Sequence, residues 1–151
     1  MKRAAGCALN RLSIDIMFDI PLHKLIIHFP IALAIVAFFY DGWAVYSKRP
    51  EMHDTGYGLT LWAAVTALFA IVTGLQIAGL GGISKGAITG HALLGMFTTA
   101  TLVALGMWRY SSRSRQEGPD ENYMIVWLIM GGLAAVLVVA TAIAGHRLMF
   151  G

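Results

Sequence analysis

Four long apolar stretches dominate the sequence, at residues 25–46, 57–80, 87–108 and 123–145. Each contains the roughly 20 apolar residues that an α-helix needs to cross a hydrocarbon core of about 30 Å. Because lipid offers no partners for backbone N–H and C=O groups, such stretches are stable as helices. Charged residues make up only 13% of the chain, whereas about a quarter is usual in soluble domains. The sequence therefore predicts an integral membrane protein.

The connections between these stretches are short, which makes consecutive helices antiparallel neighbours. We predict an all-α fold, an antiparallel up-down four-helix transmembrane bundle formed by residues 17–151. Residues 1–16 are basic but lack the apolar core of a signal peptide. They are interpreted as a flexible N-terminal tail or as a mis-assigned start, with Met17 as the alternative first residue. The single cysteine excludes a disulfide within the chain and a cysteine-based metal cluster.

The up-down order assigns each histidine to one membrane face. We name the face where the first stretch begins face A and the opposite one face B. His23, His28, His91 and His146 belong to face A, and His53 alone belongs to face B. At a rise of 1.5 Å per residue, His28 and His91 lie roughly 4–6 Å inside their stretches, and His146 directly follows the fourth. Three helices are therefore predicted to bring an imidazole to a similar depth.

Imidazole is the most common protein ligand for metals and a frequent ligand of haem iron, and helix bundles build such sites in their cores. We predict a haem b site with His28 and His91 as axial ligands and His146 as a third candidate. Gly95, one turn beyond His91, leaves room for the ring. Arg147 is a candidate partner for a haem propionate or for a lipid phosphate. His28, His91 and His146 are equally the candidate ligands of a copper or zinc ion.

Two alternatives stay open around His28. Pro30 lies inside the first helix, where a kink turns His28 towards the bundle axis, or the helix begins near Pro30 and His28 is a capping or headgroup-facing residue. His23 precedes His28 by five positions, about 140° around a helix. The two histidines are therefore not expected to share one ligand site, and His23 is assigned to the surface or to a second site.

Asp41 and Arg109 carry opposite charges near face B. A carboxylate within a membrane span is a functional candidate by default. The interpretation that we favour is a paired residue close to the headgroups, with Arg109 as its partner. The sequence contains no nucleophile–base pair, phosphate-binding loop or pair of catalytic carboxylates, which argues against hydrolase and kinase chemistry.

Several motifs resemble the family catalogued as domain of unknown function 2231: "LHKLIIHFPIAL", "FFYDGWA", "TGLQ", "GHALLG" and "AGHRLMFG". The resemblance runs from Ile20 to the C-terminus and implies a four-helix bacterial membrane protein. It equates His28 with the family's entry histidine, which precedes the FPIA motif, and His91 with its third-helix histidine. Lys24 stands where relatives carry proline, and the shorter C-terminus departs from the pattern at His146. Relatives are fused or adjacent to Rieske or c-type cytochrome domains, which implies a redox setting.

These observations predict a b-type haem electron-transfer protein or a subunit of a membrane redox complex. Its partners would be the lipid bilayer, a quinone, and a c-type cytochrome or Rieske protein. The alternatives are a copper- or zinc-binding membrane protein and a cofactor-free structural or assembly subunit. An electron carrier or accessory subunit is favoured over a stand-alone enzyme. The pI near 9.2 reflects basic flanks of the helices and implies no nucleic-acid partner.

The predicted location is the bacterial inner membrane. Counted from Met17, face A carries three Lys and Arg residues and face B carries five. The positive-inside rule then places face B in the cytoplasm and the histidine face in the periplasm. Counted from Met1, the numbers become six and five, and the preference disappears.

Overall fold

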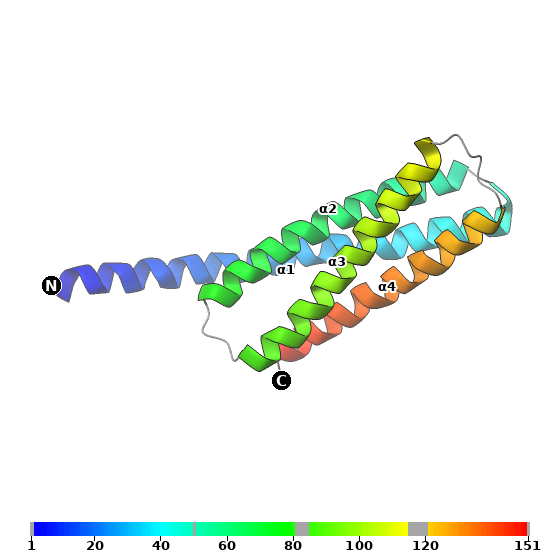
Figure 1. The fold of residues 1–151 in the computed structure, drawn as a ribbon. Helices are drawn as coiled ribbons and strands as arrows, with labels where there is room; N and C mark the ends of the chain where they lie inside the picture. Colours follow the sequence, from blue (N-terminus) through cyan, green and yellow to red (C-terminus); the bar gives the residue numbers. More distant parts are fainter. Residues whose placement is uncertain (1, 50, 81–84, 115–120, 151) are drawn as a thin grey trace.

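The structure, a computed structural model, describes the backbone except at residues 1, 50, 81–84, 115–120 and 151. The surroundings of side chains are described over residues 22–49, 51–77, 90–113 and 123–147. Four helices account for the described backbone almost entirely: α1 (Lys2–Ser47), α2 (Glu51–Leu80), α3 (Lys85–Ser114) and α4 (Glu121–Phe150). Figure 1 shows them side by side, with α1 extending beyond the other three at its N-terminal end.

Each helix contains a segment long and apolar enough to span a membrane: Leu22–Ser47, Glu51–Ile77, Gly90–Arg113 and Tyr123–Arg147. The predicted all-α, four-helix transmembrane architecture is thereby confirmed. Early residues of one helix meet late residues of the next, since His23 of α1 bonds Thr73 of α2 while Asp41 bonds His53. Consecutive helices α1 and α2 therefore run in opposite directions.

The helices are longer than the apolar stretches that predicted them. Helix α1 begins at Lys2, so residues 2–16 belong to the same helix as the first apolar stretch. Helix α2 begins at Glu51, six residues before the predicted position 57, which places His53 in a helix rather than in a loop. Helix α1 also runs without a break through Pro30, which is buried. Of the two alternatives for Pro30, the structure therefore shows the internal one, which leaves the carbonyl of Ile26 without its helical donor.

Each helix packs against two others in the cyclic order α1–α2–α3–α4, with the closest packing between α1 and α2. Figure 1 shows the α3–α4 pair inclined to the α1–α2 pair. The apolar core consists mainly of small residues: Ala34, Ala63, Ala64, Ala67, Leu102, Ala134 and Val138. Small side chains let membrane helices approach closely.

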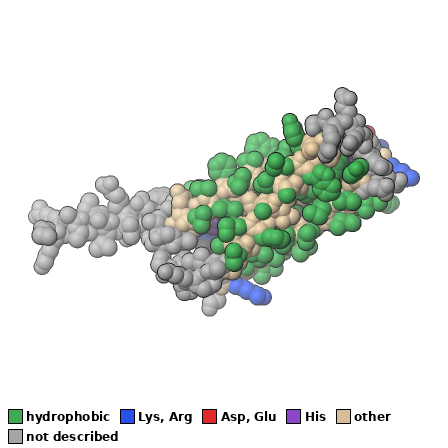
Figure 2. Space-filling view, in the orientation of Figure 1, with side chains coloured by type: hydrophobic (Ala, Val, Ile, Leu, Met, Phe, Trp, Pro, Cys, Tyr) green, Lys and Arg blue, Asp and Glu red, His purple; other side chains and the backbone are tan. Residues whose placement is uncertain are grey.

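Most large apolar side chains lie outside this core. Phe39, Trp62 and Val136, for example, are each well over half exposed, and Figure 2 shows hydrophobic side chains spread over the face of the bundle that it presents. In contrast, the largest fully buried side chains are Arg109, Leu102 and Asp41. Lipid tails are as apolar as leucine side chains, so a bundle in lipid gains little from gathering its large apolar residues in the interior. The interior can therefore hold charged groups, provided that they are paired.

Candidate functional site

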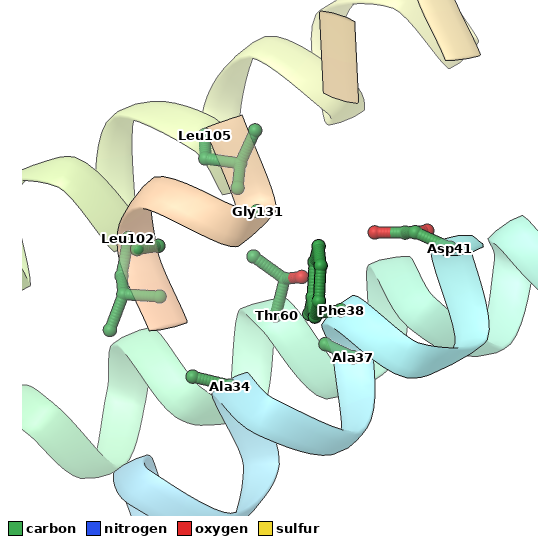
Figure 3. A pocket seen from close by; sticks show the side chains of 9 residues that line it. Ala34, Ala37, Phe38, Asp41, Thr60, Leu102, Leu105 and Gly131 are labelled. Carbon is green, nitrogen blue, oxygen red and sulfur yellow. The ribbon is translucent and has the colours of Figure 1, made fainter. Parts of the chain in front are cut away.

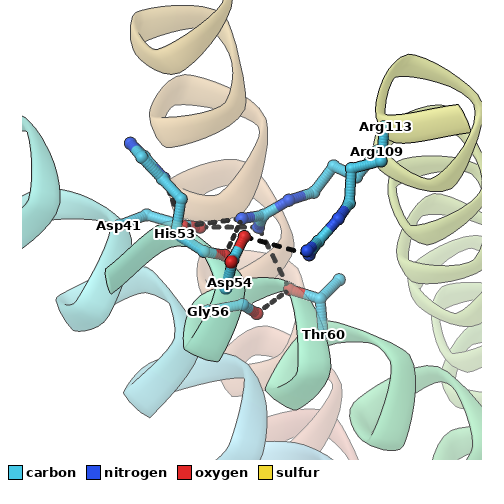
Figure 4. Close-up of polar contacts among 7 residues, drawn as sticks. All are labelled: Asp41, His53, Asp54, Gly56, Thr60, Arg109 and Arg113. Atoms are coloured by element: carbon cyan, nitrogen blue, oxygen red, sulfur yellow. Dashed lines mark hydrogen bonds and ion pairs between the residues drawn. The ribbon is translucent and has the colours of Figure 1, made fainter. Parts of the chain in front are cut away.

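An ion pair between Asp41 and Arg109 lies in the interior of the bundle near face B, and both side chains are only 1% exposed. Arg109 donates from Nη1 to Asp41 Oδ2 and from Nη2 to Oδ1, each over 2.8 Å. Two parallel N–H···O bonds of this kind are the strongest arrangement of a guanidinium and a carboxylate. The predicted pairing of Asp41 with Arg109 is confirmed, and it joins α1 to α3 across the bundle (Figure 4).

Helix α2 adds two residues to this pair. His53 Nδ1 lies 2.9 Å from Asp41 Oδ1, and the carbonyl of His53 accepts a hydrogen bond of 2.9 Å from Arg109 Nη2. Thr60 donates to the carbonyl of Gly56 and lies 3.5 Å from Arg109 Nη1. We refer to Asp41, His53, Thr60 and Arg109 as the charged cluster; it connects three helices.

Thr60 and His53 were not predicted as members of the charged cluster. His53 was expected to stand alone at face B, in the connection before the second apolar stretch. A usable signal was present, because His53, Gly56 and Thr60 follow one another at intervals of three and four residues. That spacing places all three on one helical face, if the helix is extended back to Glu51.

Gly56 makes the close approach of α1 and α2 possible at the charged cluster. A Cβ atom at this position would lie 3.0 Å from Asp41 Cγ, closer still to Asp41 Oδ1, and 3.3 Å from the carbonyl oxygen of Ala37. The contacts would be with the backbone of Ala37 and with the carboxylate of Asp41, which two partners hold in place. Neither group can move away easily. The absence of a side chain at Gly56 is therefore part of the construction of the site.

Aromatic rings cover the cluster towards α4 and face B. The Arg109 Cζ atom lies 5.2 Å from the ring centre of Trp127 and 5.9 Å from that of Tyr57. The rings of His53 and Trp127 meet edge to face at 5.9 Å. Further out, Arg113 stacks over Tyr57 and pairs with Asp54 at 3.0 Å. The indole and phenol faces contribute cation–π attraction to the buried guanidinium.

A small cavity of about 10 Å³ lies beside the carboxylate of Asp41, between all four helices (Figure 3). Asp41 and Thr60 are its polar lining residues, and the others are apolar: Ala34, Ala37, Phe38, Leu102, Leu105, Gly131 and Ala134. A volume of this size holds at most about one water molecule. The cavity is therefore too small for an organic substrate.

The charged cluster pairs its opposite charges. Two N–H groups of Arg109 bind the two carboxylate oxygens of Asp41. The charges of Asp41 and Arg109 cancel, which lets the pair exist in a membrane span. His53 adds an imidazole whose Nδ1 is bonded to Asp41 Oδ1.

The second site lies at the opposite end of the bundle, towards face A. His23 of α1 is half-buried, and its Nδ1 lies 2.8 Å from Thr73 Oγ1 on α2. His91 of α3 is also half-buried. The Nδ1 atom of His91 is buried and has no hydrogen-bond partner.

Each of these two rings lies against a glycine of a neighbouring helix. A Cβ atom at Gly74 would be 3.2 Å from His23 Cε1, and one at Gly145 would be 2.9 Å from His91 Cε1. The second distance is too short for a real contact, so a side chain at Gly145 would displace the His91 ring. We refer to His23, His91, Gly74 and Gly145 as the histidine pair site.

The other predicted ligands are exposed, whereas His91 is half-buried. His28 is exposed and its Nδ1 bonds the carbonyl of Lys24 in its own helix. His146 and Arg147 are also exposed. Gly95 packs against Thr141 of α4, since a Cβ atom added at Gly95 would lie 3.6 Å from Thr141 Cγ2. Gly95 therefore contributes to the contact between α3 and α4. Among the described residues, no three His, Cys, Asp or Glu side chains form a metal-binding group.

The rotation of α1 explains why His23 takes the place expected for His28. The buried residues Pro30, Ala34, Ala37 and Asp41 form an inward stripe at intervals of three and four. His23 lies seven residues before Pro30 and therefore continues this stripe. His28 lies about 140° away from His23 and is directed outwards, in spite of the proline that follows two residues later.

Comparison with known proteins gives one match. The family described as "Predicted membrane protein (DUF2231)" matches residues 19–151. Comparison with curated proteins and with solved structures finds no match.

Proposed function

Since the chain belongs to the DUF2231 family of predicted membrane proteins, we propose that it is a b-type haem-binding electron-transfer protein or a subunit of a membrane redox complex. The residues that would hold the haem are His23 and His91. The observation that carries this proposal is the histidine pair site, in which α1 and α3 each place a half-buried imidazole against a glycine of a neighbouring helix, towards face A. This pair replaces the combination of His28 with His91.

The hydrogen bonds of Thr73 suit His23 to the role of a ligand. The Thr73 hydroxyl lies 3.1 Å from the carbonyls of Phe69 and Ala70, to which it donates its proton. Thr73 Oγ1 therefore accepts from His23 Nδ1, which must carry the ring proton. The Nε2 atom of His23 then has a free lone pair. Histidine ligands are commonly oriented in this way by a partner on the other ring nitrogen.

His91 offers a second candidate ligand. Its buried Nδ1 atom without a partner is costly in an apolar environment, and a bound group that engages this ring would remove part of the cost. Gly74 and Gly145 let the two imidazoles pack directly against the neighbouring helices, because a Cβ atom at either position would crowd a ring.

A bound haem b would supply reversible one-electron chemistry at iron. The chain itself would hold and orient the ligands and keep water away from them through the surrounding helices. Electron exchange with a quinone and with a c-type cytochrome or Rieske protein belongs to this proposal. So does a position in the bacterial inner membrane with face A in the periplasm.

Absorption spectroscopy tests the proposal and the choice of ligands. Protein purified after haem-replete expression is expected to show a Soret band and sharp α and β bands on reduction with dithionite. His23→Ala and His91→Ala are each expected to abolish these bands or convert them to a high-spin spectrum, because one axial ligand is lost. His28→Ala and His146→Ala are the matched controls and should leave the spectrum unchanged.

Other outcomes identify the alternatives. Loss of the bands in His28→Ala, with His23→Ala unaffected, would restore the ligand pair predicted from the sequence. The absence of haem bands together with one copper or zinc per chain in metal analysis would favour a metal-binding protein. The absence of both would favour a cofactor-free structural or assembly subunit.

Gly145→Ala is expected to disturb the histidine pair site without removing a ligand. The added methyl group would lie 2.9 Å from His91 Cε1, so the ring must turn or α4 must move away. We expect at least a tenfold loss of haem affinity or a shifted reduced spectrum, measured by haem titration of the cofactor-free protein. Gly90→Ala is the control, because a Cβ atom there meets nothing within 4 Å although it neighbours His91.

A further inference from the structure

His53 is a titratable side chain in an unusual position, and the proposed haem site does not involve it. It lies near the start of a membrane-spanning helix and is only 4% exposed. Its Nδ1 atom is held by Asp41, whereas its Nε2 atom is buried and has no hydrogen-bond partner. A buried ring nitrogen without a partner calls for an explanation, because most buried polar atoms are paired.

The partners of His53 determine which ring nitrogen carries the proton. Asp41 is bound by two N–H groups of Arg109 and is therefore ionised, so it can only accept hydrogen bonds. His53 must then donate from Nδ1 to Asp41 Oδ1. In the neutral imidazole this leaves Nε2 with a lone pair, which makes it an available base.

The charged and titratable groups around His53 come from every helix packed against it, among the residues that the structure describes. Helix α1 contributes Asp41, and α3 contributes Arg109, with Arg113 further out. Its own helix adds Asp54 and Tyr57, while α4 presents the uncharged indole of Trp127. The charges of Asp41 and Arg109 cancel, as do those of Asp54 and Arg113. A proton on His53 would therefore add one net positive charge to this end of the bundle.

We propose that His53 is a proton-binding site within the membrane-spanning bundle, and that Nε2 is the atom that takes the proton. The proton comes from water at face B, since the Ala and Leu core lies on the other side of the charged cluster. No covalent bond other than the new N–H bond is made or broken. The imidazolium keeps its hydrogen bond to Asp41 Oδ1, which becomes charge-assisted.

Proton binding has a defined consequence for Arg109. Both His53 Nδ1 and Arg109 Nη2 are bonded to the same oxygen, Asp41 Oδ1, at 2.9 and 2.8 Å. When His53 is charged, two cations share this atom and repel each other. The bond from Arg109 Nη2 to Oδ1 is thereby weakened, whereas Arg109 retains Oδ2 through Nη1.

Nitrogen-15 NMR of histidine-labelled protein in lipid bilayers tests this site. At pH 8 we expect a protonated Nδ1 and an unprotonated Nε2 at His53, and at pH 5 a proton on both nitrogens. A correlation between the ring and the Asp41 carboxyl carbon assigns the signal in the wild-type protein. An Nε2 atom that stays unprotonated at pH 5, or a proton on Nε2 and none on Nδ1 at pH 8, would overturn the proposal.

A variant pair separates proton binding from structure. His53→Asn retains an N–H donor near the Nδ1 position, so the bond to Asp41 can persist while titration is lost. Proton uptake between pH 8 and pH 5, measured by titration of the purified protein, is expected to fall by one proton per chain. His28→Asn is the control, since it removes an exposed histidine and should leave the His53 signal unchanged. Unaltered uptake in folded His53→Asn would contradict the proposal, whatever the result at the haem site.

Discussion

Replacing Arg109 by methionine is expected to lower the free energy of unfolding by about 3–5 kcal/mol, which is typical when one partner of a buried ion pair is removed. The substitution leaves Asp41 charged, 1% exposed and without its two strongest donors. We expect this loss of stability to appear as unfolding at a lower concentration of denaturing detergent when the protein is titrated in mixed micelles.

Two controls show whether the effect arises from the uncompensated charge. Arg113→Met removes the partner of Asp54, but these side chains are 45% and 64% exposed. An exposed pair of this kind contributes no more than about 1 kcal/mol. In the double variant Asp41→Asn with Arg109→Met, no charge is left unpaired, and most of the stability should return. An Arg109→Met protein as stable as Arg113→Met would show that the buried pair does not hold the helices together.

Gly56→Ala is expected to be the second most disruptive of the substitutions discussed. The new methyl group would lie 3.0 Å from Asp41 Cγ and 3.3 Å from the carbonyl oxygen of Ala37. Helices α1 and α2 must separate, or the carboxylate must leave Arg109. Inserting a methyl group into a packed interior costs about 1–3 kcal/mol, and any weakening of the ion pair adds to this. The same detergent titration measures the change.

Gly58→Ala is the matched control for Gly56→Ala. It lies two residues further along α2, and a Cβ atom there meets nothing within 4 Å. Alanine favours a helix over glycine by up to about 1 kcal/mol, so Gly58→Ala should be neutral or slightly stabilising. Equal effects of the two substitutions on stability would mean that the close approach of α2 to Asp41 does not determine the stability of the bundle.

Hydropathy alone was sufficient to predict the architecture. Four predominantly apolar stretches of more than twenty residues leave a membrane helix as the only structure that satisfies the backbone. The pairing of Asp41 with Arg109 was also predictable, because a carboxylate within a span needs a partner of opposite sign and Arg109 directly follows the third stretch, near the same face. Both results depend on local composition and on the energetic cost of burying polar groups.

The ends of the helices were less predictable, since polar residues can extend a helix beyond the lipid. Helix α2 begins at Glu51, in a segment that hydropathy assigns to a loop. As a result His53 was placed outside the second helix, and its bond to Asp41 was not foreseen. The spacing of His53, Gly56 and Thr60 gave a signal that only becomes visible once the helix is extended.

The sequence by itself predicted four membrane-spanning helices and the pairing of Asp41 with Arg109, but placed that pair close to the headgroups rather than in the bundle interior. The tertiary structure alone decided which histidines face inwards, His23 and His91 rather than His28 and His146. The physical reason is that lipid and bundle interior are both apolar, so hydropathy fixes the depth of a residue in the membrane but not the rotation of its helix. That rotation is set by close contacts between helices, at Gly56 against Asp41 and at Gly145 against His91.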